Sequence, residues 1–490
     1  MRIFFYVAVL TLLFSCKKTI EPLQGRGTGN GTGIGNSGAS NKPPVANAGP
    51  DQTIAILTFY TTATLNGNNS FDSSGMSLQF SWRQISGPSN SFLQTPGMGE
   101  CWVYNITTPG VYSFELRVSN SNGTDLDTTN ITLQDPSYCQ SNRPEIPATL
   151  TYLSDLPGQI QDPEIIAAGN KLIIPAWFSN ATSIISNNIY LYDHVTQNWT
   201  TIHASLARVG AVTIVADNKV FFAGGMSGWD DIYTTTSVVD IYDLTTNTWS
   251  VTNLSEARTD CKAVVSGNKI FFAGGLKNNY ILSNKVDIYD LETNTWSSSV
   301  MPGGARAVGA ALTAFNKVLF FGGYTWYEDP TGFGNILTTP SAVIDIYDCN
   351  TGQWSLDSMQ INKASFAAIS VNEKVYLAGG TVNNAGTFHV EELNVNTMNS
   401  SSSCLHQPMI CEIDKGAATK NDMIIFFTSP IISGTDINEF DIYNTQTGLW
   451  SIGVLPPGLI QTGSYTPIAI GSTNSEIYTV IGTKLYRMNL

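Results

Sequence analysis

Basic side chains are scarce in this sequence of 490 residues, and charged side chains of both signs make up only 13% of it. The 24 lysines and arginines are outnumbered by 38 aspartates and glutamates, which leaves a formal net charge of −14 at pH 7. Nucleic-acid phosphates need a basic protein surface, so this composition excludes nucleic acid as a partner. Because 42% of the residues are hydrophobic, we expect a β-rich exported fold whose surface is made polar by Ser, Thr and Asn.

Residues for metal or covalent chemistry are also few. The chain holds four histidines without a metal-ligand spacing, and it has no phosphate-binding loop and no nucleophile motif. We therefore predict no metal, no cofactor and no catalytic residue.

Seven cysteines are present, and six remain when Cys16 is set aside. Six cysteines allow about 15 pairings in principle. Cys404 and Cys411 are close in the sequence and flank a loop, which favours a local disulfide, and Cys101 with Cys139 is a second candidate pair. Export makes such disulfides permissible without requiring them.

The first 16 residues have the features of an export signal. Arg2 supplies a positive start, and residues 3–14 are almost all apolar but too few to span a bilayer. The end of this segment, Leu13-Phe14-Ser15-Cys16, resembles a bacterial lipoprotein processing box, which implies that Cys16 is lipidated. An ordinary secretory signal with an unrelated cysteine is the alternative. Residues 17–42 follow as a Gly/Ser-rich tether, so we expect a protein anchored to the bacterial outer membrane, at the cell surface or on the periplasmic face.

A repeat dominates the chain from residue 149 onward. One copy reads Asn268-Lys269-Ile270-Phe271-Phe272-Ala273-Gly274-Gly275, then Asp287-Ile288-Tyr289-Asp290, then Thr295-Trp296-Ser297. The apolar run is typical of a buried strand, and the alternating Asp-Ile-Tyr-Asp motif is typical of a half-buried one. With a small-residue strand before the Asn-Lys turn, each copy makes four antiparallel strands. One such sheet cannot bury both faces alone, so the copies must stack.

This repeat occurs about every 50 residues and resembles the kelch repeat. Its anchor tryptophans are Trp199, Trp249, Trp296, Trp354 and Trp450. The resemblance implies an all-β fold in which residues 149–490 form a β-propeller of seven four-stranded blades. A segment before the first repeat, residues 150–157, matches the Trp-bearing fourth strand, so we predict that it completes the last blade and closes the ring. A six-bladed ring with a loose tail is the alternative.

Residues 43–134 form a separate predicted β domain. The opening Pro43–Gln52, the turn Ser70-Phe71-Asp72 and the strand that carries Trp82 resemble a PKD domain, which is an immunoglobulin-like β-sandwich. The resemblance implies a spacer or a weak binding module with Trp82 in its core. Residues 135–148 contain three prolines and are predicted to be a linker.

Function is expected in the loops on one face of the propeller. The loop between the second and third strands of each blade and the loop into the next blade emerge on this face, and they carry aromatic, acidic and basic side chains. The predicted ligand-binding residues are Trp177, Arg208, Trp229, Asp230, Asp231, Arg258, Asp260, Tyr280, Arg306, Tyr324, Trp326 and Tyr327. Because the arginines recur at one repeat position, bracing of neighbouring blades is the alternative for them.

Aromatic rings beside charged groups suit sugar recognition, and they also suit a protein hot spot. We predict a monomeric module that binds a glycan or protein ligand. The alternative is a sugar-active enzyme of the kelch type, resembling sugar epimerases or mutarotases. A galactose-oxidase-like enzyme has weaker support, because no family motif surrounds the four histidines: His194, His203, His389 and His406.

Overall fold

We analysed a computed structural model of the chain. It describes residues 42–49, 51–55, 63–73, 75–106, 108–134, 143–161, 163–179, 184–229, 232–328, 336–382, 385–409, 416–427, 438–459, 468–473 and 475–490. The regular structure in these residues is β-strand, apart from one 3-10 turn, η1 (Asn278–Tyr280). No helix in this part of the chain is long and apolar enough to cross a membrane.

The N-terminal domain is a sandwich of two sheets. One has the order β1 (Gln52–Ala55), β7 (Gly123–Gln134), β6 (Gly110–Asn120), β3 (Gln79–Ser86), and the other has the order β2 (Ala63–Asn66), β5 (Glu100–Tyr104), β4 (Phe92–Leu93). Strand β6 alternates, so that Tyr112, Phe114, Leu116 and Val118 all point into the core. Trp82 is buried in the same core, and its Nε1 donates to the carbonyl of Met98 at 3.1 Å. The predicted immunoglobulin-like domain is confirmed.

The described residues that follow form seven sheets of at least four strands, which we number as blades 1 to 7, and one two-stranded sheet. Blades 1 to 3 are β10 (Ile166–Ala168), β11 (Lys171–Ser179), β12 (Ile184–Asp193), β13 (Asn198–His203); β14 (Val212–Ala216), β15 (Lys219–Ala223), β18 (Val238–Asp243), β19 (Thr248–Asn253); and β20 (Lys262–Ser266), β21 (Lys269–Ala273), β22 (Lys285–Asp290), β23 (Thr295–Val300). Blades 4 and 5 are β24 (Ala310–Ala314), β25 (Lys317–Glu328), β26 (Ile336–Asp348), β27 (Gln353–Ser358); and β28 (Ala367–Val371), β29 (Lys374–Ala378), β31 (Ala385–Asn394), β32 (Asn399–Met409), with β30 (Thr381–Val382) beside β31. Blades 6 and 7 are β33 (Ala417–Lys420), β34 (Met423–Phe426), β35 (Glu439–Asn444), β36 (Leu449–Val454); and β37 (Ile468–Ser472), β38 (Ile477–Ile481), β39 (Lys484–Asn489), β9 (Thr149–Asp155).

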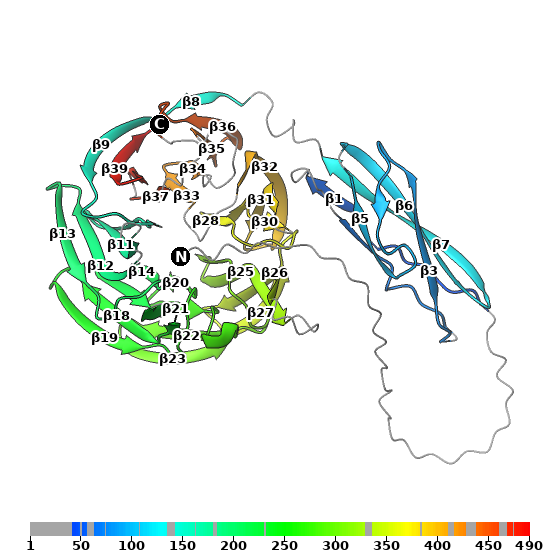
Figure 1. The fold of residues 1–490 in the computed structure, drawn as a ribbon, viewed down its shortest axis with the longest axis horizontal. Helices are drawn as coiled ribbons and strands as arrows, with labels where there is room; N and C mark the ends of the chain where they lie inside the picture. Colours follow the sequence, from blue (N-terminus) through cyan, green and yellow to red (C-terminus); the bar gives the residue numbers. More distant parts are fainter. Residues whose placement is uncertain are drawn as a thin grey trace, which may run out of the picture.

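The blades form a closed ring (Figure 1). The inner strand of each blade contacts the inner strand of the next, and β37 contacts β10. In blade 7 the C-terminal strand β39 pairs antiparallel with β9, from Lys484↔Asp155 to Asn489↔Thr149. The predicted closure by the N-terminal strand is confirmed, and the six-bladed alternative is wrong.

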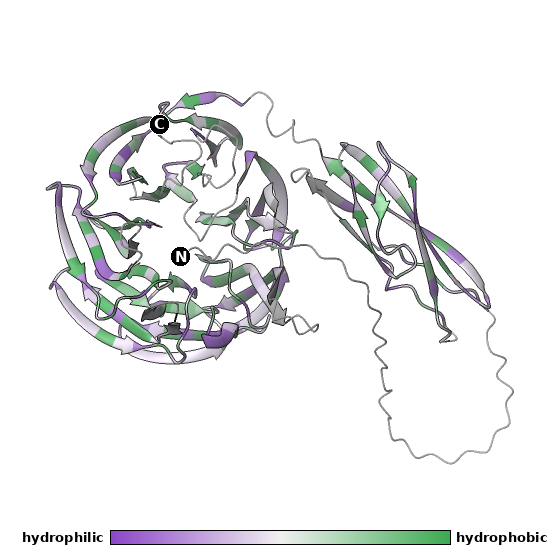
Figure 2. Ribbon diagram, in the orientation of Figure 1, coloured by the Kyte–Doolittle hydropathy of each residue, from purple (hydrophilic) through white to green (hydrophobic). Residues whose placement is uncertain are grey.

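Blade 3 shows why this sequence folds as it does. The central strand β21 is buried on both faces, and Phe271 and Phe272 have no exposed surface. Gly275 ends the strand at φ 95°, and a Cβ there would lie 2.5 Å from the carbonyl oxygen of Thr259 in the preceding connection. Only glycine allows this close approach. Hydrophobic segments recur along the strands of every blade (Figure 2).

The anchor tryptophans join neighbouring blades. The Trp296 ring packs on Tyr289 with centroids 4.9 Å apart, and its Nε1 donates to Thr252 Oγ1 in blade 2 at 2.9 Å. Trp354 makes the same kind of bond to Ser299, and Trp199 makes it to Ser154 in β9. These three tryptophans therefore tie their own hairpin to the blade before it.

One strand lies outside the predicted pattern. Strand β8 (Glu145–Pro147), in the segment assigned to the linker, pairs in parallel with β36 and widens blade 6 to five strands. Proline is tolerated in an edge strand, and Pro147 leaves that edge with fewer donors for another chain.

Candidate functional site

The three arginines predicted to bind ligand are buried ion-pair partners. Arg258 has no exposed surface, and its Nη2 donates to Asp287 Oδ2 at 2.7 Å and to the carbonyl of Phe272 at 2.9 Å. Arg208 with Asp240 and Arg306 with Asp345 repeat this arrangement at 2.7 and 2.6 Å. The ligand-binding prediction is therefore wrong for Arg208, Arg258 and Arg306, because their side chains are sealed inside the blades. Each instead braces the connection from the previous blade against its own blade.

The carboxylates in these pairs occupy one repeated position, the first acidic residue of the Asp-Ile-Tyr-Asp motif or its equivalent. We call this position the carboxylate slot; its members are Asp240, Asp287, Asp345, Glu391 and Asp441. In four blades this carboxylate also accepts a hydrogen bond from a main-chain N–H. The donor lies at or near the end of the fourth strand of the preceding blade. Those donors are Ser205, Gly303, Gln360 and His406. The slot is thus a structural joint of the ring.

Two predicted aromatic residues pack at blade boundaries. The Trp177 ring meets Phe222 of blade 2 edge-on at 5.6 Å, with the Arg208 guanidinium 5.8 Å from its centroid. The Tyr324 hydroxyl lies 2.9 Å from Thr381 Oγ1 in blade 5. Both side chains are half-buried, so their main contacts are between blades.

Other predicted residues lie on two hairpins that extend beyond the four-stranded blades. Trp229 ends β16 (Met226–Trp229), which pairs with β17 (Ile232–Thr235), and Trp326 and Tyr327 lie in the extended part of β25 that pairs with β26. The side chains of these three residues, and Asp230 and Asp231 entirely, lie outside the described residues. Their ligand contacts stay predictions.

Tyr280 is exposed to solvent on the shorter connection of blade 3, which lies between these two hairpins in the ring. Its side chain is 56% exposed, and that of the next residue, Ile281, is 53% exposed. The loop is anchored, because Asn278 Oδ1 accepts the N–H of Thr235 at 2.8 Å from the neighbouring hairpin. An exposed ring on an anchored loop is a preorganised contact surface.

Asp260 is the predicted acid whose position the structure describes. It directly precedes the inner strand of blade 3, has a left-handed backbone (φ 53°), and donates its N–H to the Gly210 carbonyl at 3.1 Å. Its side chain is exposed. Desolvation by the protein around it nevertheless raises the pKa of the Asp260 carboxyl, against the opposing effects of Lys262 and Thr259.

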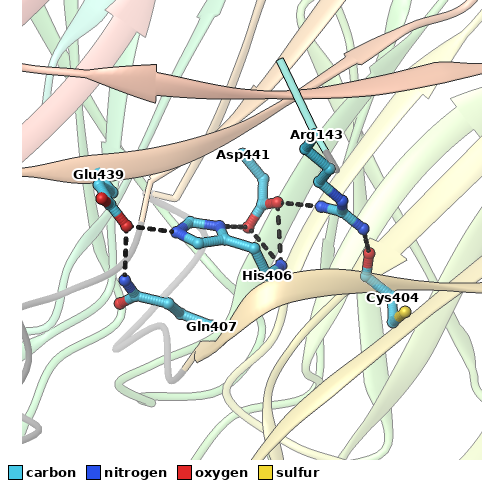
Figure 3. Close-up of polar contacts among 6 residues, drawn as sticks. All are labelled: Arg143, Cys404, His406, Gln407, Glu439 and Asp441. Carbon is cyan, nitrogen blue, oxygen red and sulfur yellow. Dashed lines mark hydrogen bonds and ion pairs between the residues drawn. The ribbon is translucent and has the colours of Figure 1, made fainter. Parts of the chain in front are cut away.

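Sequence reasoning missed a charged network in blade 6 (Figure 3). Asp441 fills the carboxylate slot there, and Arg143 Nη1 donates to its Oδ1 at 2.5 Å. His406 lies beside it, with Nδ1 2.8 Å from Asp441 Oδ2 and Nε2 3.2 Å from Glu439 Oε2. Gln407 donates to the same Glu439 oxygen at 3.1 Å. The sequence did carry a signal. Blades 2 to 5 have a lysine or arginine four residues before the inner strand, whereas Ile413 stands at that place before β33 of blade 6.

The charge state of His406 follows from its neighbours. Burial disfavours its protonated form, but the hydrogen bonds and charges of Asp441 and Glu439 outweigh burial, so the pKa of His406 is raised. In blade 5 the pKa values of two buried basic groups, Lys363 and His389, are lowered instead. Burial lowers the pKa of Lys363 to about 7 against the attraction of Glu391, and burial together with Lys363 lowers the pKa of His389 to about 3.

One of the two predicted disulfides is contradicted by the structure. Cys101 is a free, fully buried thiol in the sandwich core, so its predicted bridge to Cys139 is wrong. Cys404 is disulfide-bonded, and its predicted partner Cys411 lies outside the described residues. Cys16 and Cys139 lie outside them too.

Within the described ranges, no group of three or more His, Cys, Asp or Glu side chains is arranged to hold a metal ion.

Two family models match parts of this chain. Residues 162–323 match the family model of the KLHDC2/KLHL20/DRC7 Kelch-repeats domain, and residues 48–133 match the K319L-like PKD domain. An F-box/kelch-repeat protein of Arabidopsis thaliana is 27% identical over 189 residues, which are 38% of this chain and 47% of that protein. The solved structure of YjhT aligns with a TM-score of 0.43 and 15% identity, covering 61% of this chain and 95% of that one.

The chain therefore contains a kelch-repeat propeller preceded by a PKD-like domain. Its match to the curated relative spans less than half of that protein's length.

Proposed function

We propose that this protein is an exported, lipid-anchored binding protein whose propeller takes a glycan ligand. The site would lie on the blade 3 connection and the two hairpins that flank it. The observation that carries the proposal is the exposed ring of Tyr280 on a loop held in place by Asn278.

The surroundings of the ring favour a sugar over a protein. A protein interface needs a broad apolar core, whereas among the described side chains of the blade 3 connection the large exposed apolar ones are Tyr280 and Ile281. The two residues before Tyr280 in the chain, Asn278 and Asn279, are also exposed, and their amide groups can exchange hydrogen bonds with hydroxyl groups. A ring that stacks on the apolar face of a pyranose, beside such amides, matches sugar chemistry. A protein ligand is the outcome we expect if no glycan binds.

One observation favours a second candidate, a sugar-active kelch enzyme. Asp260 is open to solvent and its pKa is raised, which are properties of a general acid. Any sugar that binds should therefore be tested for turnover, with Asp260→Asn as the variant that separates binding from catalysis.

The test is a glycan-array scan of the soluble chain from residue 43 onward, with Tyr280→Ala as the variant. We expect saturable binding to a related set of sugars and a loss of roughly tenfold in affinity in the variant, which corresponds to about 1.4 kcal/mol. Tyr152→Ala is the matched control, because Tyr152 is 51% exposed but lies on the rim strand β9. Equal affinity of Tyr280→Ala and the unaltered chain would disprove this site.

The proposal also covers the cellular location and the oligomeric state of the protein. Cys16 would carry the lipid anchor, and the tether and PKD-like domain would hold a monomeric propeller off the outer membrane. The acidic net charge of −14 argues against nucleic acid as a competing partner.

A further inference from the structure

The sheet β2-β5-β4 of the N-terminal domain has one face in the core and the other in solvent. Strand β5 alternates, so that Cys101 and Val103 point into the core, whereas Trp102 lies on the outer face and is 39% exposed. Phe92 of β4 is 57% exposed and pairs with Tyr104 of β5, so both belong to the outer face as well. Aromatic side chains of two neighbouring strands therefore gather on one solvent-facing surface. We call it the aromatic face, and its members are Phe92, Trp102 and Tyr104.

The rings of the aromatic face stand on a rigid support. The Tyr104 hydroxyl donates to Gln94 Oε1 at 2.8 Å, and the ring centroids of Phe92 and Tyr104 lie 6.2 Å apart with 50° between the ring planes. Trp102 is two residues from Tyr104 on the same strand, which places it about 7 Å along β5. Because the backbone under the rings is fixed in a sheet, a ligand that binds them loses little free energy in ordering the protein.

Polar side chains accompany the rings. Thr64 of β2 lies opposite Trp102, and Asn66 follows on the same face at an exposed position. Together with Gln94 they offer hydroxyl and amide groups, which can exchange hydrogen bonds with the hydroxyl groups of a ligand. The three strands of this sheet contain no lysine or arginine, and Glu100 is their one charged residue. An anionic ligand finds no counter-charge on this face, so a neutral, hydroxyl-rich ligand is favoured.

The size of the aromatic face argues against a protein partner. The sheet has three strands, and the longest of them has five residues, so the face measures roughly 14 by 17 Å. That is about 240 Å², whereas a stable protein interface covers about 800 Å² on each partner. A short stretch of a sugar chain fits this area. A pyranose can stack its apolar C–H face on an aromatic ring and turn its hydroxyl groups toward the polar side chains beside it.

We propose that the aromatic face is a further binding site of this protein, which takes a neutral polysaccharide. It lies in the N-terminal domain and does not rest on the site proposed at Tyr280 of the propeller. Because the Phe92 and Tyr104 rings are tilted by 50°, they cannot both lie flat on one sugar ring, so each contacts a different unit of the chain. A soluble chain that twists between its units suits this arrangement, and the flat surface of a crystalline polysaccharide does not.

The experiment is affinity electrophoresis of the full chain, solubilised in a neutral detergent, in native gels that contain xylan, galactomannan or mixed-linkage β-glucan. We expect at least one of these neutral polysaccharides to retard the protein. Phe92→Ala and Trp102→Ala should each weaken the affinity roughly tenfold, whereas Trp102→Phe, which keeps a ring, should weaken it less. Phe71→Ala is the matched control, because Phe71 is in the same domain and is also 57% exposed but lies outside this sheet.

Tyr280→Ala separates the aromatic face from the propeller. Retardation that survives Tyr280→Ala and is weakened by Phe92→Ala supports the aromatic face, whether or not the Tyr280 loop also binds sugar. The proposal is overturned if none of the three polysaccharides retards the unaltered chain, or if Tyr280→Ala abolishes the retardation. It is also overturned if Phe92→Ala binds as tightly as the unaltered chain or no more weakly than Phe71→Ala. The unfolding midpoint of each variant is measured first. If Trp102→Ala does not fold, Phe92→Ala and its control still decide the question.

Discussion

Each buried arginine satisfies several acceptors that an apolar residue would leave unpaired. Arg258 serves Asp287 and two main-chain carbonyls, of Phe272 and Lys285, all inside blade 3. A buried ion pair of this kind contributes little net stability compared with apolar packing, but removing one partner costs about 3–5 kcal/mol, because the other charge remains buried. The pair thus acts at the residue scale as a check on register, since only the correctly placed strand brings its carboxylate to the guanidinium.

The position two residues before the carboxylate slot varies in charge from blade to blade. It is occupied in blades 2 to 6 by Val238, Lys285, Val343, His389 and Glu439. We predict a pH effect at His389. Its pKa is lowered from 6.5 to about 3 by burial and by Lys363. Between these two values the unfolded chain binds more protons than the folded one, so the free energy of unfolding decreases as pH falls through the window. His389→Val should weaken this acid sensitivity, since Val238 and Val343 occupy the same place in blades 2 and 4.

Urea unfolding at pH 7 and pH 4.5, followed by tryptophan fluorescence, checks this prediction. The stability lost on acidification should be smaller in His389→Val than in the unaltered protein. The exposed His203 supplies the control, and His203→Val should keep the full acid sensitivity. An equal loss in His389→Val would mean that His389 is not held neutral by the fold.

At the scale of the element, the Gly-Gly pair of blades 2 to 5 lets the connection that enters each blade pack closely against it. Gly225, Gly275 and Gly380 all have φ near 100°, and a Cβ on any of them would meet main-chain atoms of that connection within 3 Å. The nearest contact is to a main-chain oxygen, so no flexible side chain can move aside to relieve it. These glycines therefore set how closely each connection packs on the blade that it enters.

Gly275→Ala should destabilise the propeller much more than Gly267→Ala. Both glycines have positive φ, but a Cβ on Gly267 would meet nothing within 4 Å, whereas one on Gly275 would lie 2.5 Å from the Thr259 oxygen. We expect about 1–2 kcal/mol for Gly267→Ala, from backbone strain alone. Gly275→Ala should cost more, because the connection that enters blade 3 at Thr259 must also move away. Chemical denaturation of both variants measures the difference, and equal costs would show that the spacing is not set by this glycine.

The sequence predicted the strands and the blade repeat better than the buried ion pairs that join them. The strands, the blade period and the closing segment were predictable because each depends on residues close together in the chain, such as Gly274-Gly275 and Trp296. The burial of Arg258 depends on pairing with Asp287 across a blade, and the only signal was that both positions recur together. The ion pair of Arg143 was harder to predict, because its partner Asp441 lies 298 residues away in the sequence. The ligand contacts proposed for Tyr280 depend on a surface that no repeat encodes.

At the scale of the whole molecule, the propeller and the proposed anchor residue belong to separate stretches of the chain. Cys16 precedes residue 43, where the predicted PKD-like domain begins, so its loss should leave the propeller intact. We predict that Cys16→Ser moves the protein from the membrane fraction to the soluble exported fraction without changing its unfolding midpoint. Fractionation followed by thermal unfolding of the released protein tests both parts. Retention of Cys16→Ser in the membrane would contradict lipid anchoring through this residue.

Residues 143–147, which carry Arg143 and β8, directly precede the closing strand β9, and this order defines a path for mechanical load. If Cys16 anchors the chain as proposed, a pull from the N-terminal side reaches Arg143 and β8 before it reaches β9 and the seam of the ring. The pairing of β8 with β36 would then break before tension acts on blade 7, and the ring would stay closed.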